Sequence, residues 1–104
     1  MIASGMATVS TVANEAGIPV ICAESGMVEN GGLITYGINY YNLGYMTGEM
    51  AVRYLNGEVA SIGDMPIEYL PAEDLEVAIN WDTAAAIGIT IPEELQALSI
   101  TQPE

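Results

Sequence analysis

The sequence contains no histidine, lysine or phenylalanine, and it has one cysteine, Cys22. Without histidine, triads built on that residue and most zinc sites are excluded. A single cysteine cannot form an intrachain disulfide, and its position inside an apolar run predicts a buried, inert thiol. No Walker loop, G-x-G-x-x-G loop or G-x-S-x-G elbow occurs. We therefore predict no enzyme activity, no catalytic residues, no metal site and no cofactor.

Basic residues are almost absent: Arg53 is the single cation against 14 acidic residues, which gives a formal net charge of −13. Nucleic-acid binding needs lysine and arginine to displace counterions, so it is excluded as a function. Anionic membrane surfaces are disfavoured for the same reason. No apolar run approaches the ~18 residues of a membrane span. The simplest interpretation of the acidic balance is a solvated surface that keeps the chain soluble.

Hydrophobic periodicity predicts helices and strands in alternation along 104 residues, enough for one small domain. A continuous apolar run is typical of a strand covered on both faces, and asparagine before an amphipathic stretch is a helix cap. We expect a helix over residues 2–16, strands over 18–23, 33–38, 65–70 and 75–79, and helices over 40–56, 83–87 and 92–98. Residues 99–104 are expected to be frayed. This order indicates an α/β layered sheet.

Polar and small residues follow two of the predicted strands. Residues 24–26 (Glu-Ser-Gly) follow the first strand, and residues 37–40 (Gly-Ile-Asn-Tyr) lead from the second into a helix. Ligands of open parallel sheets bind beyond the carboxyl ends of the strands. Simpler interpretations also apply, because Glu24 can be a solvated carboxylate, Asn39 a helix cap and Tyr40 a core residue. The two strand ends together indicate a binding site better than either does alone.

Four stretches in a fixed order carry a family resemblance. They are residues 2–6, residues 13–20, residues 37–40 with Gly44 and Ala51, and Asn80 and Ala84 with residues 88–92. In order and spacing the chain resembles the ABC-transporter substrate-binding proteins related to tryptophan- and tyrosine-binding components. No single stretch is specific, but together they cover nearly the whole chain.

The resemblance implies a hinged, two-lobed type I periplasmic-binding-protein fold, in which an amino acid or similar small solute lies between the lobes. Residues 1–98 would be the C-terminal lobe, a three-layer Rossmann-like or flavodoxin-like α/β unit with a mostly parallel sheet. The full-length protein would be extracytoplasmic and would pass its solute to an ABC permease. The residues on this lobe's side of the cleft would be Ser4, Glu24, Ser25, Gly26, Ile38, Asn39 and Tyr40.

The sequence departs from the family pattern because it has no first lobe and no lipoprotein signal. Half a cleft buries too little of a ligand, so we expect weak or no binding by this chain alone. Because the family chain crosses between lobes near its end, residues 75–98 are left open to either lobe. Surface exposed by the missing lobe predicts a homodimer. The alternative function is a self-associating α/β structural piece that binds no ligand.

Overall fold

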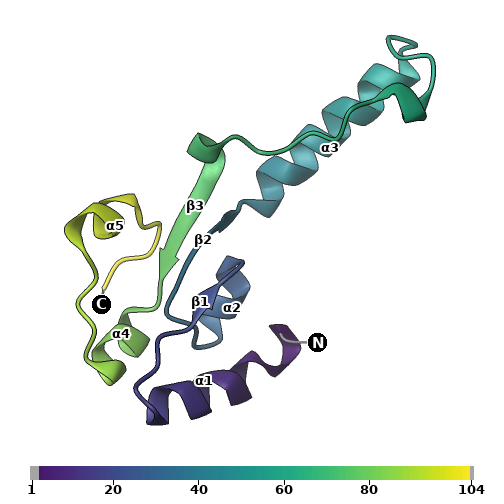
Figure 1. Ribbon diagram of the computed structural model, residues 1–104. Helices are drawn as coiled ribbons and strands as arrows, with labels where there is room; N and C mark the ends of the chain where they lie inside the picture. The colour runs from purple at the N-terminus through teal and green to yellow at the C-terminus, as the bar shows by residue number, and fades with distance from the viewer. Residues whose placement is uncertain (1–2, 104) are drawn as a thin grey trace. The chain divides into compact units, whose positions relative to one another are not determined.

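The computed structural model describes residues 3–103 and divides into two units (Figure 1). The first unit consists of Met1–Gly37 and Glu76–Glu104, and the second consists of Ile38–Leu75. The chain therefore leaves the first unit once and returns to it once. Among the described residues, no helix is long and apolar enough to cross a bilayer.

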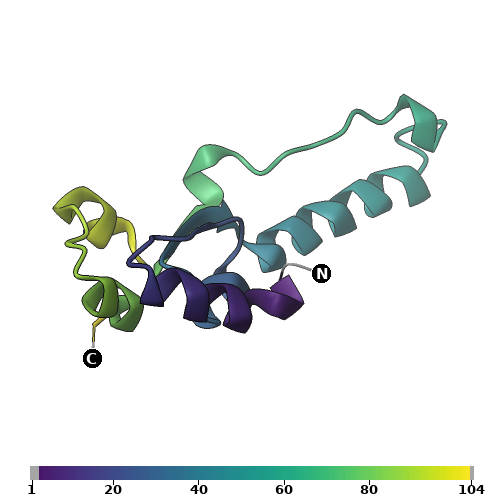
Figure 2. The ribbon, with the colours of Figure 1, turned by 60° about the horizontal axis from the view of Figure 1, so that its bottom comes forward.

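The first unit contains most of the secondary structure. Its elements are η1 (Ala3–Gly5), α1 (Met6–Glu15), β1 (Ile21–Cys22), α2 (Ser25–Glu29), β2 (Ile34–Ile38), β3 (Leu75–Ile79), α4 (Trp81–Ile87) and α5 (Glu93–Leu98). Ile38 and Leu75, the outermost residues of β2 and β3, are counted with the second unit. Helices α1 and α4 lie side by side (Figure 2).

The sheet has the strand order β1-β2-β3. Strands β1 and β2 are parallel, with Ile21 opposite Ile34 and Cys22 opposite Thr35. Strand β3 runs the opposite way beside β2 (Figure 1), and the Asn80 amide donates to the Leu33 carbonyl at 2.9 Å. The sheet thus joins a parallel pair to an antiparallel edge, where the sequence predicted mostly parallel strands.

Strand β3 divides the core into two layers because its side chains alternate between the faces of the sheet. Val77 and Ile79 belong to one buried cluster, which also contains Leu33, Ala84 and Ile91. Ala78 belongs to the other, with Met6, Cys22 and Val28. Helix α4 therefore contributes to one layer, and α1 and α2 contribute to the other. This arrangement confirms the predicted α/β lobe.

The C-terminal segment lies along β3. The Ile100 amide donates to the Val77 carbonyl at 2.8 Å, and the Thr101 hydroxyl bonds both the amide and the carbonyl of Ile79. Ser99 forms a parallel bridge with Val77. We predicted fraying from residue 99 onward, but residues 99–101 are held by these bonds.

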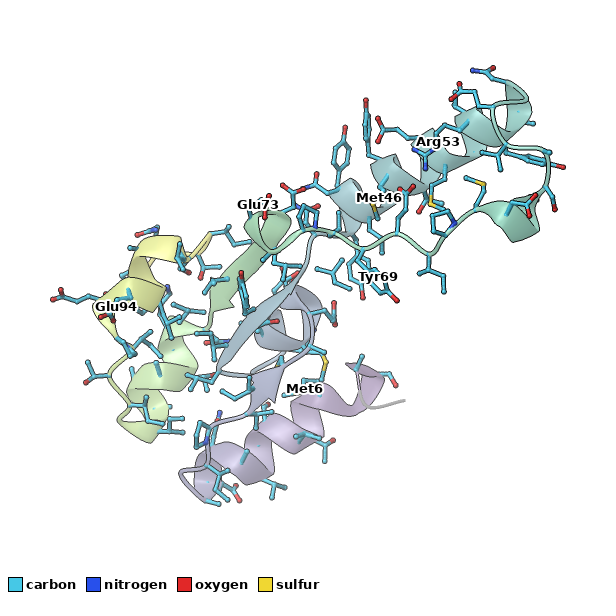
Figure 3. All side chains as sticks on the ribbon, turned by 45° about the horizontal axis from the view of Figure 1, so that its top comes forward. Met6, Met46, Arg53, Tyr69, Glu73 and Glu94 are labelled. Carbon is cyan, nitrogen blue, oxygen red and sulfur yellow. The ribbon has the colours of Figure 1, made fainter. Side chains whose placement is uncertain are left out.

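The second unit is built on one long helix, α3 (Tyr40–Leu55), followed by the 3₁₀ turns η2 (Ile62–Asp64) and η3 (Ala72–Asp74). The predicted strand over residues 65–70 is wrong: the segment is extended without a strand partner among the described residues. Pro66 lacks the N–H that a paired strand needs. The segment is instead held by an ion pair between Arg53 on α3 and Glu68. Figure 3 shows Arg53 and Met46 projecting from α3.

Candidate functional site

The two parallel strands end at the same edge of the sheet, as the sequence predicted. A Cβ built on Gly37 would lie 2.7 Å from the carbonyl oxygen of Ala23 and 2.7 Å from the hydroxyl of Thr35. The backbone leaving β1 is therefore in close contact with the end of β2. Glycine at position 37 is required by this contact within the sheet, independently of any ligand.

Replacing Gly37 with alanine should destabilise the first unit. The added methyl group meets a backbone carbonyl that cannot rotate away, so we expect a loss of about 1–3 kcal/mol in the free energy of unfolding. Urea denaturation measures this loss. Gly44→Ala on α3 is the control, because nothing lies within 4 Å of a Cβ built there. Equal stability of the two variants would show that Ala23 does not confine Gly37.

Glu24, Ser25 and Gly26 form the turn that begins α2. One oxygen of the Glu24 carboxylate accepts a hydrogen bond from the Gly26 amide at 3.2 Å, which caps the short helix. All three residues are half-buried. Burial raises the pKa of the nearby Cys22 thiol, and the charge of Glu24 raises it further. Cys22 is thus buried, as the sequence predicted, and its raised pKa favours the protonated thiol.

The other predicted site residues lie elsewhere in the chain. Ile38, Asn39 and Tyr40 belong to the second unit, and Ser4 lies exposed on η1 in the first. The Asn39 side chain accepts from the Asn42 amide at 2.9 Å and so caps α3, as predicted. Tyr40 is 61% exposed, which excludes the interpretation that it is a core residue. The structure therefore brings Glu24, Ser25 and Gly26 together at one turn. Ile38, Asn39 and Tyr40 lie in the second unit, and Ser4 lies on η1.

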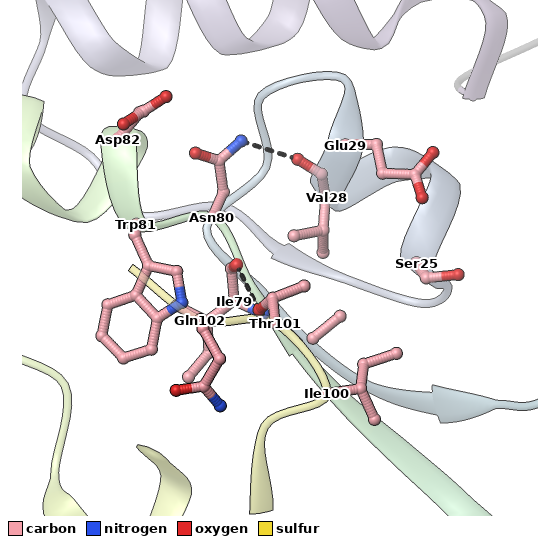
Figure 4. A pocket seen from close by; sticks show the side chains of 11 residues that line it. Ser25, Val28, Glu29, Ile79, Asn80, Trp81, Asp82, Ile100, Thr101 and Gln102 are labelled. Carbon is pink, nitrogen blue, oxygen red and sulfur yellow. Dashed lines mark hydrogen bonds between the residues drawn. The ribbon is translucent and has the colours of Figure 1, made fainter. Parts of the chain in front are cut away.

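A cavity of about 270 Å³ lies within the first unit (Figure 4). It is lined by Ser25, Val28, Glu29, Ala78, Ile79, Asn80, Trp81, Asp82, Ile100, Thr101 and Gln102. Of these residues the sequence pointed only to Ser25 as a site residue. Trp81 is the only tryptophan, and it directly follows the strand over residues 75–79 and the cap Asn80. This position was the one feature of the sequence that could have indicated the cavity.

The polar groups deep in this cavity mostly bond to the protein itself. The Asn80 amide accepts from the Thr83 backbone and donates to the Val28 carbonyl, and both bonds are 2.9 Å long. Thr101 is bonded to Ile79, as described above. The buried Trp81 Nε1 has no partner in the described residues. Glu29 and Asp82 are exposed. Among residues 3–103 no cluster of three metal-ligating side chains occurs. The side chains that line the cavity are suited to noncovalent contacts with a ligand.

Comparison with known proteins identifies relatives over nearly the entire chain. The family model described as ABC transporter substrate binding protein matches residues 1–102. A tyrosine-binding protein of Clostridioides difficile (strain R20291) is 45% identical over 89 residues. Those residues are 86% of this chain and 25% of the relative.

Solved structures show the same similarity. A ligand-free, open substrate-binding protein with adhesive properties from Clostridium difficile is 46% identical, with a TM-score of 0.68 over 99% of this chain and 33% of its own. An ABC domain from Streptococcus pneumonia in complex with L-Trp is 34% identical, with a TM-score of 0.77 over 95% of this chain and 32% of its own. The chain thus spans about a quarter to a third of the length of these relatives.

Proposed function

Because the chain belongs to the ABC transporter substrate-binding protein family, whose members bind solutes and are not enzymes, we propose that it forms one side of an amino-acid-binding cleft. The observation that carries this proposal is the parallel pair β1 and β2, which end together where the backbone at Ala23 meets Gly37. Such an edge is where open α/β sheets bind their ligands.

The side chains after the two strands suit a zwitterionic aromatic ligand. Glu24 offers a half-buried carboxylate, and carboxylate–ammonium hydrogen bonds are among the stronger polar contacts. Tyr40 offers an exposed ring that can pack on an aromatic side chain. Relatives named for tyrosine and solved with L-Trp support this ligand class. We propose Ser4, Gly26, Ile38 and Asn39 as further cleft residues with Ser25.

The proposal extends to the protein in which the chain operates. The remaining two thirds of a relative's length would supply the opposite side of the cleft. The complete protein would lie outside the cytoplasm and deliver its solute to an ABC permease. The chain alone would bind weakly or not at all, because a good pocket buries about 70–90% of its ligand.

Replacing Glu24 by glutamine should weaken binding of L-tyrosine about 10- to 100-fold, because a charged hydrogen bond to the ammonium group contributes about 1.5–3 kcal/mol. Glutamine keeps an oxygen that can cap α2. The host is a chimera in which this chain replaces the matching 89-residue segment of the tyrosine-binding relative. Titration calorimetry with L-tyrosine and L-tryptophan measures the dissociation constants.

Glu29→Gln is the matched control, because Glu29 is a carboxylate of the same α2 helix that lines the 270 Å³ cavity. We expect its affinity to equal that of the unmodified chimera. Weakening by Glu29→Gln, with Glu24→Gln unchanged, would move the ligand from the strand ends to the cavity. An unmodified chimera that binds neither amino acid would contradict the proposed ligand class.

A second candidate function, self-association without a ligand, is favoured by one observation. Ile18 and Ile21 are exposed, and β1 has no strand partner on its outer edge among the described residues. Unpaired apolar edges are templates for association between chains. The homodimer inferred from the sequence therefore stays a prediction.

A further inference from the structure

The dipeptide Asn-Gly occurs twice in the chain, at residues 30–31 and 56–57. This pair is prone to spontaneous deamidation, because glycine has no side chain to hinder attack by its backbone nitrogen. That nitrogen bonds to the Cγ atom of the asparagine, the bond from Cγ to the side-chain nitrogen breaks, and ammonia leaves. Water then opens the succinimide ring to aspartate or isoaspartate. The net reaction consumes one water molecule and releases one ammonia molecule.

Both pairs must open before they can react. Each glycine amide donates to the carbonyl three residues earlier, at 3.0 Å. The ring closes only when the glycine nitrogen lies beside Cγ, whereas ψ is 22° at Asn30 and −3° at Asn56, which turns that nitrogen away. The two pairs therefore start from similar conformations and differ in what else must be broken.

The first pair is held by the surrounding first unit. The Asn30 Nδ2 group donates to the Gly26 carbonyl at 2.7 Å, and the Thr83 hydroxyl of α4 donates to the Gly31 carbonyl at 3.2 Å. A Cβ built on Gly31 would overlap the side chain of Ser10, so the backbone there lies against α1. Rotation at Asn30 therefore breaks bonds within α2 and to α4, and it has little space.

The second pair lies exposed at the end of α3. Nothing lies within 4 Å of a Cβ built on Gly57, and among residues 3–103 no hydrogen bond holds the Asn56 side chain. The Glu58 amide closes the turn by donating to the Arg53 carbonyl at 3.0 Å. Because helix ends fray, this turn opens more readily than the packed loop around Asn30.

We propose that Asn56–Gly57 is a deamidation site of this chain and that the fold of the first unit protects Asn30–Gly31. Each hydrogen bond that must open lowers the reactive population several-fold, so Asn56 should react about tenfold or more faster than Asn30. The reaction places a negative charge at the C-terminal end of α3, where the helix dipole disfavours anions. This inference is independent of the proposed cleft and of its solute.

The test compares the two sites within one sample. The 104-residue chain is incubated at mildly alkaline pH, which favours loss of the proton from the attacking nitrogen. The chain has no lysine and Arg53 is its single arginine, so trypsin separates Asn30 and Asn56 into different peptides. Mass spectrometry follows the conversion of amide to acid in each peptide, and fragmentation locates it. We expect Asn56 to convert about tenfold or more faster in buffer, and the two rates to become similar in concentrated urea.

Two variants assign the difference to the structure. Thr83→Val keeps the shape of the side chain but removes the bond to the Gly31 carbonyl, so Asn30 should react several-fold faster while Asn56 is unchanged. Asn56→Gln should leave its peptide unconverted, because glutamine closes the larger six-membered ring far more slowly. An unchanged rate at Asn30 in Thr83→Val would contradict its protection by α4.

Two results with the unmodified chain would overturn the proposal. Equal rates at the two sites in buffer, or a faster reaction at Asn30, would show that the first unit does not protect its Asn-Gly pair. A slow reaction at Asn30 that persists in urea would assign the difference to neighbouring residues in the sequence, and the fold would then have no part in it.

Discussion

Replacing Ile79 with alanine should lower the free energy of unfolding by about 2–5 kcal/mol, because the substitution opens a cavity in a core that can close only partly. Ile79 is 2% exposed and belongs to the cluster around Leu33, Val77 and Ala84. Its backbone amide and carbonyl are both held by Thr101, which limits relaxation into the space. Urea denaturation followed by fluorescence of Trp81 measures the change, since the indole packs against the same cluster.

Ile67→Ala provides the matched control for this prediction. Ile67 carries the same side chain but is 79% exposed in the second unit. Its replacement should alter the free energy of unfolding by less than about 0.5 kcal/mol. Similar losses for both variants would mean that β3 is not the centre of the stable core.

Elements with strong local signals were predicted closely from the sequence. Strand β3 has the bounds predicted for it, residues 75–79, because apolar β-formers there end at a capping asparagine. Helix α3 begins after Asn39, and the Asn39 side chain makes the predicted capping bond. Asn80 caps α4 in the same way, by accepting from the Thr83 amide. Each of these features is decided by residues within a few positions of one another.

Features that depend on distant partners were missed. Thr101 bonds Ile79 across 22 positions, and nothing in residues 99–104 by itself indicates that pairing. Residues 65–70 alternate as a strand would, yet they find no strand partner among residues 3–103. The cavity around Trp81 was missed for the same reason, because it is lined by three segments far apart in the chain.

The meeting of the two parallel strands was predictable up to Gly37, where the chain leaves the first unit. Parallel strands imply a common edge, and the contact between Gly37 and Ala23 shows that edge. Tyr40 was weighed as a core residue because it shares the apolar side of its helix. Tyr40 is exposed instead, so an apolar stripe on a helix does not by itself decide which of its residues are buried.

Replacing Asn80 with alanine should cost about 2–4 kcal/mol, because one side chain supplies two separate bonds. Its oxygen caps α4 through the Thr83 amide, and its nitrogen donates to the Val28 carbonyl across 52 positions. The substitution removes the cap and leaves that half-buried bond unmade, so α2 loses its link to the end of β3. Urea denaturation measures the loss.

Asn80→Asp separates the two contributions. Aspartate keeps an oxygen for the Thr83 amide but cannot donate to the Val28 carbonyl, and it brings a negative charge towards that oxygen. If the link to α2 carries most of the effect, aspartate should be nearly as destabilising as alanine. Stability close to that of the unmodified chain would instead assign the effect to the cap. In that case the bond across 52 positions would add little to the first unit, and the position of α2 would depend on the buried contact of Val28 with Met6 and Ala78.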